Sequence, residues 1–374
     1  MRVIFSTDQV YLHGGIERVM ALKANYIAAL PGMEVHIVTT EQQGHQPCFE
    51  LDSRIQLHDL SINYDRSKSY FSFSNIKKAF GHYRKLKHTF KVLQPDVVIV
   101  CNYAFDFFFM PFLYSRAAKV KEFHSSRYFE QQARQNTKSF LRKILYKLTD
   151  YIEGKYDAII ALNKDEKQYY NANNVVVIPN PIAIPDQLPV VHKKTWAIAA
   201  GRIAPVKGFQ YLIEAWGKVH QVLPGWELHI YGDSYLDTQQ KLASQVQQAG
   251  LDDVVLFKGV ASDMTSIFPE YSMYVMSSET ECFPMVLLES LAVGLPIVSF
   301  DSPNGPRNII VNKEDGLLAI YKNIDDLAEK IIFLAQNPQI GAQMGQKARE
   351  NVQRFELGRV MDLWLNLFDR IIKK

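Results

Sequence analysis

Two glutamates eight positions apart, in the segment ETECFPMVLLES, are the residues whose spacing most suggests chemistry. Glu281 lies three positions before Pro284, and Glu289 lies five positions after it. Because proline suits the first turn of a helix, we expect Glu281 in a loop outside a helix N-terminus and Glu289 about a turn and a half inside. Eight helical residues rise about 12 Å, and a partly helical path rises less. That span is comparable with the separation between the sugar and the ribose of a nucleotide-sugar.

The helix start between these carboxylates suits an anion. The N–H groups of Met285 and Val286 would lack partners within the helix, and the helix dipole adds positive charge there. We therefore expect a diphosphate over these groups, with the carboxylates accepting hydrogen bonds from sugar hydroxyls. Glu289 could instead be an ordinary acid on a helix surface. Its apolar neighbours favour a buried helix, where an unpaired charge is costly; they are Leu287, Leu288, Leu291 and Ala292.

Two further loops could bind an anion, and each has an ordinary alternative. Arg202 and Lys207 lie in GRIAPVKG, before a helix expected from Phe209. A guanidinium and an ammonium group there could both bind a diphosphate, or could simply be solvated. Gly14 and Gly15 follow the first strand-like run and would let backbone N–H groups approach an anion. A tight turn between strand and helix would use the same glycines, and the sequence has no G-x-G-x-x-G motif here.

Together these segments resemble the retaining glycosyltransferases of family 4, which have the two-domain GT-B fold. The matching segments follow the family's order across nearly the whole chain, and the Glu-x7-Glu segment with the LAVGLPIV after it is the most specific. The segments are GGIER (14–18), FHSS (123–126), IPNPI (178–182), GRIAPVKGFQYLIEA (201–215), YGDS (231–234), FKGV (257–260), ETECFPMVLLESLAVGLPIVSFD (279–301), NGPRNII (304–310) and DGLL (315–318).

The resemblance implies roles for individual residues. His124 would lie beside the transferred sugar near its 6-hydroxyl, and Glu281 would bind the region of the sugar's 3-hydroxyl. Glu289 would bind the ribose hydroxyls, and Arg202 and Lys207 would bind the diphosphate. The other donor-binding positions would act through the main chain: Gly14 and Gly15 at the phosphate, Gly259 and Val260 at the base, and the segment of Cys282, Phe283, Met285 and Val286 at the sugar and phosphate.

The sequence departs from the family pattern at two positions. Cys282 stands where a glycine commonly follows the first glutamate, so the loop must reach the sugar without the freedom of glycine. This substitution leaves the sugar preference open. Asn308 stands where many members have an acid after Gly-Pro, and we do not carry over any role that depends on that charge.

The elements that must position these residues follow an alternating pattern. Short apolar runs alternate with segments of helical period, which predicts βαβ units and parallel sheets. The proline-rich stretch 180–192 predicts a linker. We therefore expect a GT-B fold of two Rossmann-like domains facing a central cleft: residues 1–183 for the acceptor and 184–355 for the nucleotide-sugar donor. A final amphipathic helix, 356–374, would cross back to the first domain. The apolar stretch from Tyr103 to Tyr114 reads as one buried helix.

The charge of the chain is uneven. Residues 1–180 hold 24 Lys and Arg against 17 Asp and Glu, whereas residues 181–374 hold 18 against 22. The segment Arg66–Lys91 has eight basic residues and no acidic one, with Tyr70, Phe71, Phe73, Phe80, Tyr83 and Phe90 among them. Such a face suits anionic lipid. A solvated helix with its apolar residues turned to the core explains the segment equally well, and nucleic acid is not expected because no reader motif accompanies the charge.

Composition bounds the cofactors and the compartment. Three cysteines in unrelated contexts indicate neither a disulfide framework nor a zinc site. No Asp-x-Asp motif follows a strand, so we expect no metal and no other cofactor. The start MRVIFSTDQV lacks the pattern of an export signal, which favours the cytoplasm, with the inner face of the cell membrane as a further place of action.

We therefore expect an enzyme that transfers a hexose from a UDP- or GDP-linked sugar to a glycan or lipid-linked acceptor, in bacterial surface polysaccharide synthesis. The alternatives are an epimerase or a phosphorylase of the same fold, or a non-catalytic module that binds sugar-nucleotide or lipid.

Overall fold

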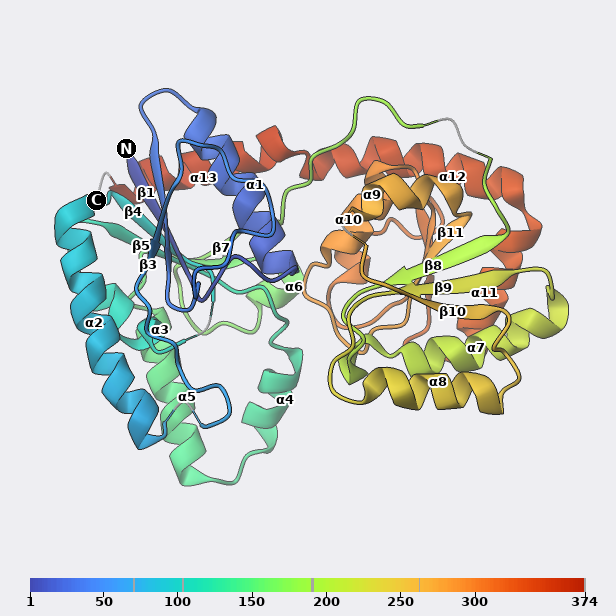
Figure 1. Ribbon diagram of the computed structural model, residues 1–374, viewed down its shortest axis with the longest axis horizontal. Helices are drawn as coiled ribbons and strands as arrows, with labels where there is room; N and C mark the ends of the chain where they lie inside the picture. Colours follow the sequence, from blue (N-terminus) through green and yellow to red (C-terminus); the bar gives the residue numbers. More distant parts are fainter. Residues whose placement is uncertain (70, 103, 190–191, 262, 373–374) are drawn as a thin grey trace. The chain divides into compact units, whose positions relative to one another are not determined.

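The computed structural model describes residues 1–69, 71–102, 104–189, 192–261 and 263–372. Its chain divides into two compact units, Met1–Pro181 with Leu357–Lys374, and Ile182–Glu356. Each unit is a parallel sheet with helices on both faces (Figure 1). The predicted class, α/β with two Rossmann-like domains, is confirmed. Among the described residues, no helix has both the length and the apolar character needed to cross a bilayer.

The described residues of the first unit form a seven-stranded sheet in the order β3-β2-β1-β4-β5-β6-β7. All of its strand pairs are parallel. Since the order runs outward in opposite directions from β1 and β4, the carboxyl ends of these two strands border the crevice where α/β sheets bind ligands. The strands are β1 (Arg2–Thr7), β2 (Glu34–Thr39), β3 (Gln56–Asp59), β4 (Val97–Val100), β5 (Ala118–Glu122), β6 (Ala158–Ala161) and β7 (Val175–Val177).

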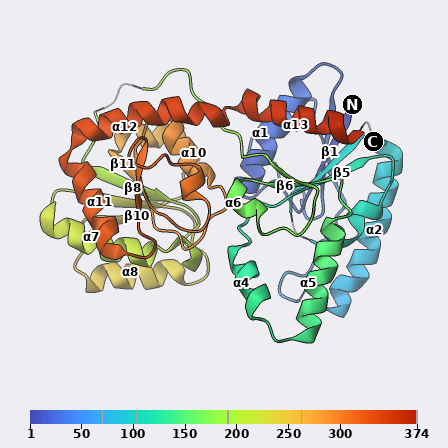
Figure 2. The same ribbon diagram turned by 180° about the vertical axis from the view of Figure 1, so that it is seen from behind.

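Helices cover both faces of this sheet. The C-terminal helix α13 contacts α1, and both lie on the face opposite α2, α3 and α5 (Figures 1 and 2). The expected return of the last helix to the first domain is confirmed. The helices are α1 (Gly15–Ala29), α2 (Phe73–Leu93), α3 (Asp106–Phe109), α4 (Tyr128–Asn136), α5 (Phe140–Glu153), α6 (Lys164–Lys167) and α13 (Leu357–Ile372).

The second unit repeats the design with six described strands in the order β10-β9-β8-β11-β12-β13. Its crevice lies at the carboxyl ends of β8 and β11, where the strand order reverses. The strands are β8 (Trp196–Ala200), β9 (Glu227–Tyr231), β10 (Val255–Gly259), β11 (Met273–Met276), β12 (Ile297–Phe300) and β13 (Gly316–Ala319). The helices are α7 (Phe209–Val222), α8 (Thr238–Gln248), α9 (Met264–Ile267), α10 (Met285–Ala292), α11 (Ile324–Gln336) and α12 (Pro338–Asn351).

One predicted element is wrong. The apolar stretch that begins at Tyr103 is not a single buried helix, because α3 ends at Phe109 and a 3₁₀ turn, Met110–Phe112, follows it. Pro111 lacks the N–H that an α-helix would need there, and the Phe112 side chain is exposed. Tyr103 itself lies outside the described residues, as do Tyr70 of the basic segment and Lys373 and Lys374 of the last helix.

Candidate active site

The loops after β8 and β11 bring two of the predicted residues together. The Lys207 Nζ lies 2.7 Å from Glu281 Oε1, and the Ser278 hydroxyl donates to the same oxygen at 2.8 Å. The side chains of Lys207 and Glu281 are 23% and 13% exposed, respectively. A cation and an anion therefore meet beyond the carboxyl ends of β8 and β11, each with a part of its surface open to a ligand.

Glycine at two positions allows this close approach. Gly208 takes a positive φ of 63°, and a Cβ there would lie 2.1 Å from the Ser277 carbonyl oxygen. Gly201 also has a positive φ, and a Cβ would press on the Lys207 side chain at 3.2 Å. Only glycine suits such positions. The 3₁₀ turn Pro205–Lys207 that precedes α7 therefore packs directly on the end of β11 and carries Lys207 to Glu281.

The loop after β12 fixes the backbone of Glu281. The Glu281 N–H donates to Pro303 O at 2.9 Å, and the Asn304 N–H donates to Glu281 O at 3.0 Å. The Asn308 side chain donates to Asn304 O at 2.6 Å, which braces this loop in turn. Asn308, which stands where many family members have an acid, thus makes a structural contact in this loop. Gly305 packs against Glu281 so closely that a Cβ would lie 2.8 Å from the Glu281 Cβ.

Helix α10 begins beside Glu281, as predicted. Pro284 is its N-cap residue and makes no side-chain cap, and the Leu287 N–H donates to Pro284 O, so the N–H groups of Met285 and Val286 are the ones that face a ligand at the helix start. Glu289 lies within the helix and is 4% exposed. Burial, together with the charges of Glu281 and Glu289, raises the pKa of the Tyr274 hydroxyl. Both carboxylates therefore lie within electrostatic range of this one buried hydroxyl.

The other predicted donor positions occupy the same edge of the second unit. Arg202 is exposed, and its guanidinium carbon lies 5.1 Å from the Tyr235 ring centroid. Gly259 ends β10 with φ of 71° and open space where a Cβ would stand, and Val260 after it is 60% exposed. Cys282 is buried and is not among the described residues with positive φ, so its backbone does not need glycine. Phe283 and Met285 are buried beside it, and Val286 is half-buried.

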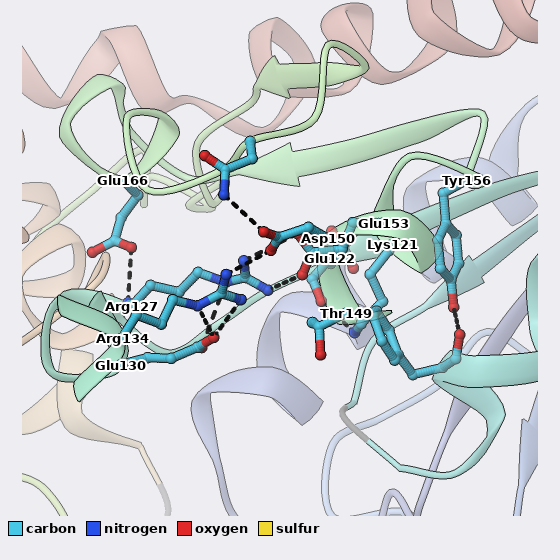
Figure 3. Close-up of polar contacts among 12 residues, drawn as sticks. Lys121, Glu122, Arg127, Glu130, Arg134, Thr149, Asp150, Glu153, Tyr156 and Glu166 are labelled. Carbon is cyan, nitrogen blue, oxygen red and sulfur yellow. Dashed lines mark hydrogen bonds and ion pairs between the residues drawn. The ribbon is translucent and has the colours of Figure 1, made fainter. Parts of the chain in front are cut away.

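In the first unit, the segment after β5 is held firmly. The Ser126 hydroxyl and the Arg127 N–H both donate to the Glu166 carboxylate. The Arg127 guanidinium forms a two-point ion pair with Glu153, and both side chains are buried. Figure 3 shows this network of Arg127, Glu153 and Glu166 with the neighbouring Arg134 pairs to Glu130 and Asp150. The backbone on the carboxyl side of His124 is therefore fixed.

His124 lies at the carboxyl end of β5 beside a buried charge that the motifs do not reveal. Its Nε2 is 3.5 Å from Glu122 Oε2, and its side chain is 7% exposed. The other Glu122 oxygen accepts from Lys23 Nζ, which comes from α1. Burial lowers the pKa of His124, with Glu122 opposing this shift and Lys23 and Lys121 adding to it. His124 is therefore neutral near pH 7. The sequence signal for this buried charge was the alternating pattern KVKE in β5, but such a pattern is typical of an exposed strand.

The two glycines at the start of α1, Gly14 as its N-cap and Gly15 as its first residue, have distinct surroundings. A Cβ on Gly14 would lie 2.3 Å from the carboxylate of Glu17, whereas a Cβ on Gly15 would meet nothing within 4 Å. The Glu17 carboxylate, which accepts from the Gln9 amide at 2.5 Å, therefore lies over the start of α1. Burial raises the pKa of Glu17. Packing does not require a glycine at position 15, and the space over it is open to a ligand.

The first unit also has a cavity of about 440 Å³ beside His124. Phe123, Ser125 and Ser126, which flank the histidine, form one part of its lining. Apolar and aromatic side chains form most of the rest, namely Phe71, Ala104, Phe105, Phe108, Leu145 and Tyr146, and the polar residues Arg127, Glu130 and Thr149 complete the lining. The cavity can take an apolar group.

Helices α2 and α5 present apolar side chains to solvent. Phe73 and Phe80 of α2 are 86% and 71% exposed, although Leu86 and Phe90 of the same helix are buried. The α5 face is wholly exposed; it consists of Phe140, Leu141, Ile144, Leu148 and Tyr151. Exposed basic residues accompany both faces: Lys77, Arg84 and Lys87 on α2, and Arg142, Lys143 and Lys147 on α5. One of the two sequence interpretations was a solvated helix with its apolar residues turned to the core. That interpretation describes only one side of α2.

Two family profiles divide the chain between them. The profile of Glycosyltransferase Family 4 matches residues 13–184, and that of Glycosyl transferases group 1 matches residues 182–351. The chain is 28% identical over 364 residues to an "Uncharacterized glycosyltransferase" of Haemophilus influenzae, which covers 94% of this chain and 95% of that protein. It is 27% identical over 222 residues to the poly(ribitol-phosphate) alpha-N-acetylglucosaminyltransferase of Staphylococcus aureus. That match covers 58% of this chain and 44% of the relative.

Solved structures share the whole fold. A mutant form of S. aureus TarM, crystallised with Fondaparinux, alpha-GlcNAc-glycerol and UDP, matches with a TM-score of 0.79 at 16% identity, over 98% of this chain and 99% of that one. The pneumococcal O-GlcNAc transferase GtfA, crystallised with UDP and GlcNAc, matches with a TM-score of 0.78 at 16% identity, over 100% and 99%. At this identity the likeness shows the fold. With both family profiles matched in order, the chain belongs to the group 1, family 4 glycosyltransferases and is a transferase of the GT-B fold.

Proposed function

We propose that this enzyme transfers a hexose from a UDP-sugar, with retention of the anomeric configuration, to a glycan or lipid-linked acceptor of a bacterial surface polysaccharide. One observation carries the proposal most directly. The pair of Lys207 and Glu281 lies at the crevice of the second unit, beside the uncapped start of α10. A diphosphate and a sugar need such a set of groups side by side. The UDP in the solved TarM and GtfA structures supports uridine over guanosine as the base.

The reaction breaks the bond between the anomeric carbon and a diphosphate oxygen. Negative charge then develops on the departing diphosphate, and fixed positive groups lower the barrier because they need no reorganisation. Lys207, Arg202 and the N–H groups of α10 supply that charge, so the proposed reaction needs no divalent metal. The acceptor hydroxyl attacks from the face that the diphosphate leaves, and its proton passes to the departing phosphate oxygen. Same-face attack on an oxocarbenium-like centre retains the configuration.

Glu281 and Glu289 have separate tasks in this proposal. Glu281 accepts hydrogen bonds from hydroxyls of the transferred sugar, and Lys207 exchanges its contact with Glu281 for the diphosphate when the donor binds. Glu289 accepts from the ribose hydroxyls. His124 of the first unit binds the sugar near its 6-hydroxyl as a neutral side chain.

The acceptor proposal rests on the first unit. A cavity of about 440 Å³ lined by the neighbours of His124 is mainly apolar, with Arg127 and Glu130 also in its lining, and Leu145 links it to the exposed apolar side of α5. Basic residues on α2 and α5 complement anionic lipid. We therefore place the enzyme at the inner face of the cell membrane, where α5 lies in the interface and presents a lipid-linked acceptor to the cavity.

Donor turnover tests the function. The purified enzyme should hydrolyse or transfer from a UDP-hexose slowly without acceptor, and a screen of UDP- and GDP-sugars by thermal shift should identify the donor. A ligand at one hundred times its dissociation constant stabilises a protein by about 2.7 kcal/mol. A protein that binds a nucleotide-sugar but never breaks its anomeric bond, with any acceptor extract, would be a binding module. Interconversion of the free donor would indicate an epimerase, and absorbance of pyridoxal phosphate would indicate a phosphorylase.

A further inference from the structure

A chain of buried contacts links the C-terminal helix to His124 within the first unit. It begins at Trp364 of α13, whose ring centroid lies 4.5 Å from Lys23 Nζ. Lys23 of α1 donates to Glu122 Oε1, and Glu122 Oε2 lies 3.5 Å from His124 Nε2. Trp364, Lys23 and Glu122 are each 1% exposed.

The burial of the Lys23–Glu122 ion pair needs an explanation. An ammonium and a carboxylate that leave water lose solvation, and a well-packed apolar pair often stabilises a fold as well or better. The sequence could have used apolar residues at these positions, since both side chains are buried and the rings of Phe5 and Trp364 lie beside Lys23. The pair therefore points to a task beyond stability.

Glu122 faces the histidine at the end of β5. The strand ends at Glu122, and the chain beyond it brings His124 Nε2 to 3.5 Å from Glu122 Oε2. Lys23 engages one carboxylate oxygen and leaves the other for the imidazole. The Cys101 thiol, from the end of β4, also donates to that second oxygen at 3.4 Å. Oε1 of Glu122 therefore accepts from Lys23, and Oε2 accepts from Cys101 and faces His124 Nε2, a buried nitrogen without a hydrogen bond to the described residues.

We propose that Glu122, held by Lys23 and Trp364, is a positioning residue that sets the orientation and tautomer of His124 for sugar binding. Glu122 can only accept a hydrogen bond, so it favours the tautomer with the proton on Nε2. Nδ1 then keeps its lone pair and accepts from a sugar hydroxyl. Through Trp364, the last helix of the chain completes the site of the first unit.

The surrounding charges agree with this role. Burial would raise the pKa of Glu122, but Lys23 and His124 hold it below its ordinary value, so Glu122 stays an anion. The charged groups that act on His124 are Glu122 of β5, Lys23 of α1 and Lys121 of β5. Lys121 donates to three carbonyl oxygens, those of Val100, Asn102 and Glu122, and its Nζ lies 4.6 Å from the centroid of the Phe123 ring. Of these three charged groups, Glu122 is the anion, and its Oε2 lies 3.5 Å from His124 Nε2.

The inference rests on the proposed function only for the role of His124, and Glu122→Gln tests it. This variant keeps the shape of the side chain and removes its charge. We expect kcat for transfer to fall by about ten- to a hundredfold, the usual loss when the partner that orients a functional histidine is removed. KM for the donor should stay within about twofold, because the main donor groups lie in the second unit. Trp364→Leu should lower kcat in the same direction, and Trp364→Phe should restore most of it.

A second readout does not depend on activity. The pKa and tautomer of His124, measured by NMR of ring-labelled histidine and assigned with His124→Asn, should change in Glu122→Gln, with the pKa lower than in the wild type. Glu34→Gln, which removes an exposed partner of Arg2 at the other end of the sheet, is the matched control and should change neither quantity.

A double-mutant cycle separates positioning from stability. In the His124→Asn background, Glu122→Gln should have no further effect on kcat, since the two residues act as a unit. An equal loss in both backgrounds, with the His124 resonances unchanged, would show that the buried pair only stabilises the fold. Full turnover by His124→Asn alone would instead refute the role of His124 in the proposed function, while the NMR titration would still report whether Glu122 sets the imidazole.

Discussion

Lys207 Nζ and Glu281 Oε1 lie 2.7 Å apart. The residue that we assign to the diphosphate therefore contacts the residue that we assign to the sugar. Such a pair keeps both side chains in place at little cost, because each is partly exposed and Ser278 adds a hydrogen bond to the same oxygen. In the proposed function, a bound donor would replace this contact with two charge-assisted ones, to phosphate and to sugar.

Separate tasks for the two glutamates predict separable kinetic effects. Glu281→Gln should lower kcat, because Glu281 contacts the transferred sugar, whereas Glu289→Gln should mainly raise KM for the donor through the ribose. A lost charge-assisted hydrogen bond costs about 1.5 to 3 kcal/mol, or roughly ten- to a hundredfold. Steady-state kinetics with the identified donor would measure both. Negligible effects from both substitutions would remove this assignment.

The proposed support of the leaving group predicts activity without a divalent metal. Lys207→Ala or Arg202→Ala should reduce transfer by about a hundredfold or more, since one lost donor at a developing charge costs on the order of 2.7 to 4 kcal/mol. Both residues lie in a loop, so the thermal midpoint should change little. Lys241→Ala, which removes an exposed cation of α8, is a suitable control. Activity that a chelator abolishes and magnesium or manganese restores would contradict the mechanism, as would full activity in both alanine variants.

The donor loops of the second unit could be predicted from sequence because their chemistry is local. Pro284 places a helix start, and Glu281 and Glu289 then fall at fixed distances from it. The contact of Lys207 with Glu281 could not be predicted, because it depends on how the turn after β8 packs on β11. That packing is revealed by the positive φ of Gly208 and by the 2.1 Å that would separate a Cβ on Gly208 from the Ser277 carbonyl oxygen.

The surroundings of His124 were hidden for a similar reason. Lys23, Glu122 and Trp364 come from three distant parts of the chain, and each one alone looks like an ordinary residue of a helix or strand. Their burial becomes visible only when α1, β5 and α13 meet. Likewise, the basic residues of α2 were visible as a cluster of charge, but the exposed apolar side of α5 was not. Its residues fit a helix that faces a core, and only the structure shows that nothing in the described chain covers them.

The exposed sides of α2 and α5 predict reversible binding to anionic vesicles. Lys143→Glu with Lys147→Glu should weaken binding by well over tenfold, since a basic residue near such a surface contributes about 1 kcal/mol. Phe140→Ser with Leu141→Ser should weaken binding at all salt concentrations, whereas the charge-dependent part should fade as salt rises because the Debye length shrinks to about 10 Å at 0.1 M. Co-sedimentation with vesicles of anionic and neutral lipid would measure this.

A control on the second unit sharpens that experiment. Lys241→Glu changes the same net charge per residue on an exposed helix, and it should leave vesicle binding nearly unchanged. Binding that ignores lipid charge, salt and the α5 substitutions would leave α2 and α5 as solvated helices. Equal losses from Lys241→Glu and the α5 variants would mean that the overall charge, rather than this face, attracts the lipid.

A buried carboxyl at the centre of the first unit predicts a dependence of stability on pH. Asp106 begins α3 and is 1% exposed, with the Ser6 hydroxyl 3.3 Å from its Oδ2. Burial and the nearby Asp8 raise the pKa of Asp106 to about 7, against an opposing effect of Lys121. The folded protein therefore keeps a proton that the unfolded chain releases above about pH 4. The contribution of Asp106 to stability should fall as pH rises from about 4 to about 7, and it should be constant above that range.

Asp106→Asn isolates this effect, since the amide keeps the shape of the protonated acid and cannot ionise. The difference in free energy of unfolding between the variant and the wild type should grow in favour of the variant across this window, by at most about 1.4 kcal/mol per pH unit. Both proteins contain the same histidines, so the contribution of histidine titration to stability cancels in this difference. Because the two units can unfold separately, the transition of the first unit should be followed on its own by calorimetry. A difference that is flat with pH, or that shrinks as pH rises from 5 to 7, would mean that Asp106 is ionised in the folded state and that Lys121 compensates for its burial.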